Sequence, residues 1–231
     1  MSAVSGMDGR LAAIASLVRP GARLADVGCD HGLLICALAA DGQIVSGIAC
    51  DVNPKPLAKA GAEIARQHLE KKLVCRLGDG LGSVSSDEVD DVVIAGMGGE
   101  LIADILSRCP WKENMAKRFI LQPMTRACHL RHWLCENGFA IETERACSAA
   151  GRVYTVMRTA YDGRRWALEP LDLYSYVGEL QKNPSPEARE LLRQSASALA
   201  KRAIGIGESA PKQAEAIYTL VQKLVTMAEG W

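Results

Sequence analysis

The chain has 231 residues, with 27 Lys plus Arg and 27 Asp plus Glu, so its formal net charge is zero. This length allows one large domain or one domain with a small appendage, and a hydrophobic content of 48% is enough for a sizeable core. The balanced charge excludes binding to a polyanion through overall charge alone, but not through local basic patches.

The sequence carries no signal-peptide pattern at MSAVSGMDGR, and no apolar run reaches the roughly 18 residues that a membrane-spanning helix needs. The eight cysteines contain no CxxC pair and lie in apolar segments. We therefore expect reduced core thiols in a cytoplasmic protein that does not enter a membrane.

Strands and helices alternate through the first 138 residues. A short amphipathic helix is expected over 11–18, because Leu11, Ile14 and Val18 recur at helical spacing. The elements expected after it are a strand over 23–28, a helix over 31–40, a strand over 44–52, a helix over 54–72, strands over 73–80 and 90–96, a helix over 99–108, a strand over 118–123 and a helix over 125–138. Such alternation predicts right-handed crossovers and a parallel sheet.

The next two strands are expected over 139–147 and 151–161, with a connection short enough for an antiparallel pair. A parallel sheet that ends in a hairpin differs from a dinucleotide-binding half, which continues with another strand–helix unit. The pattern favours an α/β fold: the seven-stranded, Rossmann-like sheet of class I methyltransferases that use S-adenosylmethionine (SAM), with an antiparallel last strand.

No strand signal remains after Asp162. Helices are expected over 171–183, 185–203 and 211–230, and the last two are expected to pair as an antiparallel hairpin that turns at Gly205 and Gly207. The sequence therefore predicts a SAM-binding methyltransferase domain over residues 1–162 and a small C-terminal helical domain over residues 163–231.

Glycines and carboxylates gather where the predicted strands end, which is the ligand-binding edge of an open α/β sheet. The first of these turns reads GCDHG and lacks the GxGxxG pattern that lets a backbone approach a pyrophosphate. A carboxylate there would repel a pyrophosphate, but it would attract the ammonium and sulfonium groups of SAM. This comparison favours SAM over a nicotinamide cofactor. The candidate cofactor-binding residues are Asp26, Gly28, Cys29, Asp30, His31, Gly32, Asp51, Val52, Asp79, Gly80, Gly96 and Met97.

Each strand end has an expected role. The glycines of the first turn admit the methionine part of SAM; Asp26 or Asp30 binds its amino group, and His31 assists with its carboxylate. Asp51 lies twenty-three residues after Gly28 and is expected to bind the ribose hydroxyls. Asp79 is expected to accept a hydrogen bond from the adenine amino group. Any one of these aspartates taken alone could instead be a helix cap.

The fourth strand end reads AGMGG and should face the methyl group. It has no side-chain acceptor for an exocyclic amine and no aromatic platform. A ring nitrogen such as adenine N1 already has a lone pair and needs no general base, so alignment and desolvation could supply most of the rate. The catalytic residue is unknown; the candidates are Gly96, Met97, Gly98 and Gln122. The alternative is that these glycines serve only close packing of helix on strand.

Five segments resemble the bacterial tRNA (adenine-22, N1) methyltransferases: RLADVGCDHGLL, DVNP, GDGL, AGMGGELI and ILQPM. The resemblance covers roughly residues 8–161, and the helical remainder matches in type only. It implies a class I methyltransferase fold, a coiled-coil-like C-terminal domain and N1-methylation of adenosine 22 in tRNA. This chain has GCDHGLLI at residues 28–35, where members of the family often have GSDHAYLP, so it lacks an aromatic residue there.

Local basic residues support an RNA partner. The candidate substrate-binding residues are Arg10, Lys117, Arg118, Arg126, Arg131 and Arg152. Such cations near a catalytic rim can contact phosphates, although solvated helix faces are the alternative. Adenine N1 lies on the pairing edge, so the target base must be unpaired or extruded. The C-terminal helices serve either RNA binding or dimerisation, and the sequence leaves the oligomeric state open.

No metal site is expected. Cys128, His129, His132 and Cys135 cluster on one predicted helix, but zinc sites normally take ligands from more than one element. The alternatives to a tRNA methyltransferase are a SAM-dependent methyltransferase of a small molecule or protein, a non-catalytic SAM-binding module and, more distantly, a nicotinamide enzyme.

Overall fold

A computed structural model describes residues 4–207 and 209–231 of the chain. The strands are β1 (Ala22–Val27), β2 (Ile44–Asp51), β3 (Leu73–Leu77), β4 (Asp91–Gly98), β5 (Arg118–Thr125), β6 (Phe139–Ala149) and β7 (Arg152–Tyr161). They form one seven-stranded sheet in the order β3-β2-β1-β4-β5-β7-β6. Strands β1 to β5 are parallel, and β7 runs antiparallel to both of its neighbours, so the predicted parallel sheet with a terminal hairpin is confirmed.

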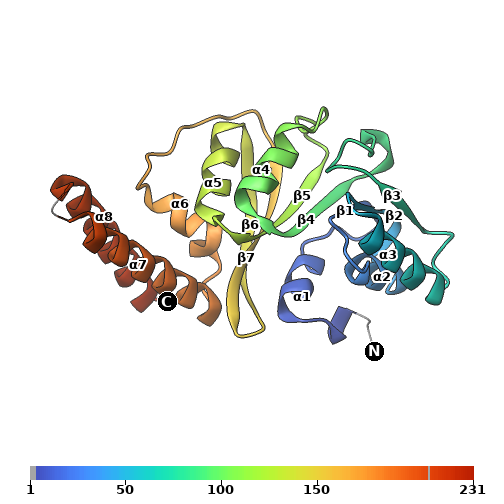
Figure 1. The fold of residues 1–231 in the computed structure, drawn as a ribbon, viewed down its shortest axis with the longest axis horizontal. Coiled ribbons are helices and arrows are strands. Elements are labelled where there is room, and N and C mark those ends of the chain that lie inside the picture. Colours follow the sequence, from blue (N-terminus) through green and yellow to red (C-terminus); the bar gives the residue numbers. More distant parts are fainter. Residues whose placement is uncertain (1–3, 208) are drawn as a thin grey trace.

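Helices cover both faces of this sheet (Figure 1). The α-helices are α1 (Gly9–Ala15), α2 (Leu33–Ala40), α3 (Pro54–Arg66), α4 (Gly99–Ser107), α5 (Ala127–Glu136), α6 (Leu173–Val177), α7 (Pro186–Ile206) and α8 (Pro211–Glu229). The short 3-10 helices are η1 (Val4–Gly6), η2 (Ser86–Glu88) and η3 (Gly178–Lys182). In the part of the chain that the structure describes, none of the helices has the length and apolarity of a membrane span.

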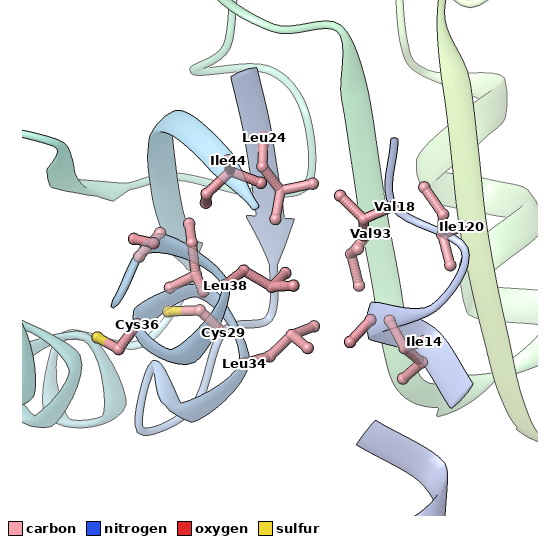
Figure 2. Close-up of a cluster of buried hydrophobic side chains, with 14 of the residues drawn as sticks. Ile14, Val18, Leu24, Cys29, Leu34, Cys36, Leu38, Ile44, Val93 and Ile120 are labelled. Atoms are coloured by element: carbon pink, nitrogen blue, oxygen red, sulfur yellow. The ribbon is translucent and has the colours of Figure 1, made fainter. Parts of the chain in front are cut away.

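Helix α1 packs on β5, β7 and β6, and its residues Arg10 and Leu11 line a cavity at the strand ends. Ile14 of α1 and Val18, which follows the helix, are buried in one cluster with Val93 of β4 and Ile120 of β5 (Figure 2). Asp8 caps the helix by accepting a hydrogen bond from the Leu11 amide over 2.8 Å. A Cβ at Gly9 would collide with the carbonyl of Ser148 in β6, so this end of α1 lies directly against the terminal hairpin.

The C-terminal helices α7 and α8 pair as predicted and lie beyond the β6 edge of the sheet (Figure 1). They have a core of their own, which includes Leu192, Leu199, Ile217 and Leu224. The turn between them is later than expected, because Gly205 is helical and α7 ends only at Ile206. We propose to keep the domain division at residues 162 and 163, just after β7 ends at Tyr161.

The helix predicted over 171–183 is divided into α6 and η3 at Gly178. Gly178 has a φ of +55°, and a Cβ there would collide with the side chains of Glu144 and Arg131. The chain turns at this residue so that η3 can pack on β6. This packing joins the C-terminal segment to the sheet.

Candidate functional site

The carboxyl ends of β1 to β4 border two adjoining cavities of about 400 and 300 Å³. Gly28, Ala95 and Gly96 line both, so the cavities form one cleft. Eleven of the twelve predicted cofactor-binding residues line it: Asp26, Cys29, Asp30 and His31 on one side, Asp51, Val52, Asp79, Gly80 and Met97 on the other, and Gly28 and Gly96 on both. The exception is Gly32, where an added Cβ would lie 3.0 Å from the Ala60 Cβ; this glycine serves close packing of α2 on α3.

The first turn, residues 28–32, contains residues with left-handed backbone conformation. Gly28 has a φ of +71°, and a Cβ there would collide with the Met97 side chain across the cleft. The amides of Gly28 and Cys29 both donate to the Cys50 carbonyl, over 2.9 and 3.0 Å, which anchors the turn to β2. Asp30 also has a positive φ, of 48°, and its side chain is directed into solvent. The left-handed φ favours glycine at residue 28, and the terminal methyl of Met97 occupies the space next to it.

Two buried carboxyl groups, from the neighbouring strands β1 and β2, lie at the floor of the cleft. Asp26 is 5% exposed and Asp51 is 8% exposed. Burial, with a smaller contribution from the Asp51 charge, raises the pKa of Asp26 to about 7. No group of the described residues donates a hydrogen bond to the Asp26 carboxyl, whereas Asp51 accepts one from the Asn53 amide over 2.8 Å. A buried carboxyl without a partner is suited to bind a cation from a ligand.

The rim of the first cavity carries exposed polar groups. The His31 Nε2 atom lies 3.0 Å from the Lys59 Nζ atom and 3.5 Å from the Asp30 Oδ1 atom. Lys59 comes from α3, and nothing in its spacing links it to the first turn. These groups can meet the carboxylate of an amino-acid ligand whose ammonium reaches Asp26.

Asp79, in the second cavity, is already engaged. Its carboxylate accepts from Arg108 over 2.5 Å, and this hydrogen bond lowers the pKa of Asp79. Arg108 also pairs with Asp104 at 2.9 Å. Both Asp79 and Arg108 are exposed, so an adenine amino group would share the carboxylate with Arg108 rather than find it free. No signal in the sequence marks this arginine as the partner of Asp79.

Strand β4 ends in a bulge that shapes the acceptor side of the cleft. The pairing of β4 with β5 shifts register on both sides of Met97, and Gly96 has a φ of +78°. The Gly96 amide donates to the Gln122 Oε1 atom over 3.0 Å, and Arg10 donates to the same atom over 3.2 Å. Gln122 is fully buried, so it does not reach a substrate. It positions Gly96 and Arg10 rather than reacting itself.

Replacing Gln122 with Met is expected to destabilise the fold by about 1–3 kcal/mol, because the Gly96 amide loses its acceptor while the side-chain volume is nearly kept. Urea unfolding measures this loss. The matched control is Arg10→Met, which removes one of the two donors but leaves the Gly96–Gln122 hydrogen bond intact and should cost less. Equal stability of Gln122→Met and the wild type would contradict the positioning role.

The six basic residues predicted to bind substrate do not share one surface. Arg10 lines the first cavity. Arg126 follows the carboxyl end of β5, and Arg152 begins β7, whose antiparallel direction puts its start at that same edge of the sheet. Arg126 and Arg152 are exposed. These three residues therefore lie at the ligand-binding edge, as the prediction requires.

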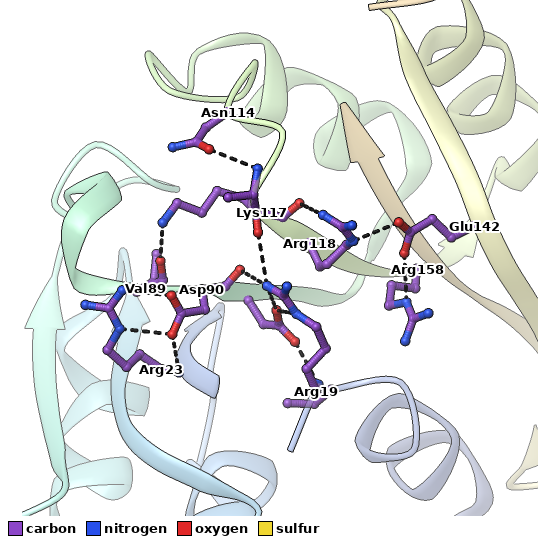
Figure 3. Close-up of polar contacts among 12 residues, drawn as sticks. Arg19, Arg23, Val89, Asp90, Asn114, Lys117, Arg118, Glu142 and Arg158 are labelled. Atoms are coloured by element: carbon purple, nitrogen blue, oxygen red, sulfur yellow. Dashed lines mark hydrogen bonds and ion pairs between the residues drawn. The ribbon is translucent and has the colours of Figure 1, made fainter. Parts of the chain in front are cut away.

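Lys117 and Arg118 lie at the opposite edge, because they precede and begin a parallel strand (Figure 3). Lys117 is 7% exposed and donates to the Val89 carbonyl over 2.6 Å. Arg118 pairs with Glu142 at 2.8 Å, beside the Arg19–Asp91 and Arg23–Asp90 pairs. Their partners are structural, and we remove both residues from the substrate surface.

Arg131 is also removed from that surface. It is 3% exposed, and its Nη2 atom lies 2.6 Å from the Glu144 Oε1 atom. Its Nη1 atom donates to the Ser175 carbonyl over 2.8 Å. A guanidinium with these buried partners cannot contact a phosphate in solvent.

The Cys–His cluster of α5 does not converge. Cys135 is buried, whereas His129 is exposed and His132 pairs with Glu136 at 3.3 Å. Within residues 4–207 and 209–231, no group of three or more His, Cys, Asp or Glu side chains is arranged to hold a metal ion.

A family model described as "Methyltransferase domain" matches residues 7–157. The tRNA (adenine(22)-N(1))-methyltransferase of Bacillus subtilis (strain 168) is 34% identical over 161 residues, which are 67% of this chain and 68% of that protein.

Two solved structures are similar to this chain over nearly its whole length. The crystal structure of Streptococcus pneumoniae Sp1610 in complex with S-adenosyl-L-methionine matches with a TM-score of 0.81 at 32% identity, over 95% of this chain and 100% of that one. The crystal structure of the B. subtilis m1A22 tRNA methyltransferase TrmK matches with a TM-score of 0.79 at 26% identity, over 97% of each chain. The similarity therefore includes the C-terminal helices.

Proposed function

Because this chain belongs to the tRNA (adenine(22)-N1)-methyltransferase family, we propose that it transfers a methyl group from SAM to N1 of adenosine 22 in tRNA. The observation that carries this proposal is the cleft itself: a buried carboxyl without a partner, Asp26, lies in the same cleft as Gly96 and Met97 at the end of β4, which offer no side-chain acceptor for an exocyclic amine. An ammonium group fits the first feature and an unpaired base fits the second.

The residues of the cleft fit SAM along its whole length. We assign the ammonium group to Asp26 and the ribose hydroxyls to Asp51, since both carboxyls are buried and line the cleft. His31 and Lys59 are the donors for the carboxylate, and Asp79 shares its charge between Arg108 and the adenine amino group. When bound, SAM supplies an electrophilic methyl group on a sulfonium.

The chain needs no general base for the transfer, because adenine N1 presents its lone pair directly. Gly96, Met97 and Gly98 supply backbone groups and one apolar side chain to orient the base, with Gln122 holding Gly96 in its bulged conformation. The protein contributes by aligning the base with the methyl group and by excluding water. For this reason no acid or base side chain is required at the end of β4.

The tRNA is expected to approach the edge of the sheet where Arg10, Arg126 and Arg152 lie, and adenosine 22 must leave its stack to reach the cleft. We also propose a cytoplasmic location, since the substrate is tRNA.

Incubation of the protein with SAM and unmodified tRNA is expected to produce 1-methyladenosine, detected by mass spectrometry of the digested nucleosides. The matched control is the same tRNA with adenosine 22 replaced by guanosine, which should give no 1-methyladenosine. SAM binding without methylation of any tRNA would indicate a non-catalytic module, and methyl transfer to a protein or small molecule alone would indicate another substrate class.

A further inference from the structure

Another cavity lies between the catalytic part and the C-terminal helices; we refer to it as the interdomain groove. It has a volume of about 320 Å³. Arg126 lines it from the end of β5, Tyr176 lines it from α6, and Ser195, Leu199 and Arg202 line it from α7. Its lining is mainly apolar.

The groove begins next to the end of β4, where the substrate base is expected to lie. Arg126 follows Thr125 directly, and Thr125 is the partner of Gly98 in the β4–β5 ladder. A Cβ at Gly99 would collide with the Arg126 carbonyl, which shows how near the two backbones lie. An RNA strand that places one of its bases at Met97 and Gly98 is therefore expected to pass Arg126 where it leaves the cleft.

A buried hydrogen-bond network holds the wall of the groove that lies opposite α7. Glu144 is fully buried and accepts from Arg131, from the Thr155 hydroxyl over 2.5 Å and from the Glu179 amide over 2.9 Å. Arg131 in turn donates to the Ser175 carbonyl, so α5, β6, β7 and the α6–η3 segment share one network. The wall of the groove opposite α7 is thus fixed by buried hydrogen bonds.

The charges at the groove suit an anion on each side of an apolar body. The Arg126 side chain is 65% exposed and has one weak ion pair, 3.5 Å from Glu100. Arg202 is exposed and forms no ion pair with any of the described residues. The half-buried ring of Tyr176 and the buried side chain of Leu199 line the same cavity. An unstacked nucleotide has this pattern of a flat base between two phosphates.

We propose that the interdomain groove holds a second unstacked nucleotide of the tRNA, close along the strand to the methylated adenosine. Its base lies against Tyr176 and Leu199, and its flanking phosphates bind Arg126 and Arg202. This inference rests on the proposed function, because the RNA occupant follows from the substrate of the adjoining cleft. The groove thereby holds the strand in its opened conformation while the target base occupies the cleft.

The test uses two serines of α7 in the full-length protein. Ser195→Trp places an indole in the groove, whereas Ser197→Trp places it on exposed surface that does not line the groove. Ser195→Trp is expected to raise the KM for tRNA about 10-fold or more, the scale of one missing base–aromatic stack, with SAM affinity unchanged. Ser197→Trp is expected to retain the wild-type KM. Circular dichroism melting verifies that both variants fold.

A charge variant tests the same proposal without adding bulk. In Arg202→Gln, the salt dependence of log K for tRNA is expected to become less steep by about 0.7, because one single-strand phosphate is no longer neutralised. A wild-type KM in Ser195→Trp or an unchanged slope in the charge variant would overturn the groove assignment while leaving the proposed function intact. A change of oligomeric state in Ser195→Trp would overturn it in favour of a subunit interface. Failure of the proposed function would appear separately, as absence of methylation by the wild-type protein.

Discussion

Asp26→Asn is expected to weaken SAM binding by about 10-fold or more at pH 8 and to abolish the pH dependence of binding below pH 7. Asp26 is 5% exposed, lines the cleft and has no hydrogen-bond partner for its carboxyl among the described residues. An ammonium at this carboxyl gains a charge-assisted hydrogen bond in a poorly solvated place, an interaction of roughly 1.5–3 kcal/mol.

The pH dependence follows from the pKa of Asp26, which burial raises to about 7. Only the ionised carboxyl attracts an ammonium, so the association constant is expected to rise up to about 10-fold per pH unit below pH 7 and to level off above it. Binding at pH 6 then releases a proton. Calorimetry in buffers of different ionisation enthalpy measures that release.

The matched control is Asp30→Asn, which removes a carboxyl from the same turn. Asp30 is exposed, with 75% of its side chain accessible, and its loss is expected to change affinity by less than about 3-fold. The sequence leaves both aspartates as candidates for the ammonium, and this pair of variants separates them. A larger effect at Asp30 than at Asp26 would reverse the assignment.

The buried Asp26 carboxyl is also expected to lower the stability of the fold at neutral pH. Because the folded state binds the Asp26 proton more tightly than the unfolded chain does, the unfolding free energy falls as pH rises from about 4 to about 7. Asp26→Asn removes this penalty, which is of order 2–4 kcal/mol at pH 8. The variant is therefore expected to bind SAM less well and yet melt at a higher temperature at pH 8.

The cofactor edge is predictable from the sequence because each determinant is local. In a parallel sheet all strands end at one edge, so residues that follow strand signals, such as Asp26, Asp51 and Gly96, come together whatever the details of packing. The hairpin of β6 and β7 is equally local, since a short connection forces antiparallel pairing. These rules place the cleft without any knowledge of side-chain packing.

The basic residues show where local rules end. Lys117 and Arg118 lie near Arg126 in the sequence. The eight residues of β5 nevertheless run across the full height of the sheet, so the residues at its start lie far from Arg126 at its end. The direction of the strand distinguishes them. No such signal exists for the hydrogen bond of Arg10 with Gln122, which joins residues 112 positions apart, or for that of Arg131 with Glu144. Those interactions depend on how α1 and α5 pack.

Glu144→Ala is expected to destabilise the protein by about 3–5 kcal/mol, the largest loss among the variants considered. The substitution leaves the Arg131 guanidinium buried without its counter-charge, and it removes the acceptor of the Thr155 hydroxyl and the Glu179 amide. Breaking one partner of a buried ion pair carries a cost of this size because the other charge stays desolvated. Urea unfolding followed by far-ultraviolet circular dichroism measures it.

The double variant Arg131→Met/Glu144→Leu distinguishes charge from shape. It removes both charges and keeps similar volume, so much of the stability missing in Glu144→Ala is expected to return. The two variants should nevertheless both raise the KM for tRNA with little change in SAM affinity, because the network fixes the α6–η3 segment and the walls of the interdomain groove but touches no residue of the cofactor cleft. A Glu144→Ala protein as stable as the wild type, or one that loses SAM affinity first, would mean that the network does not separate the two sites in this way.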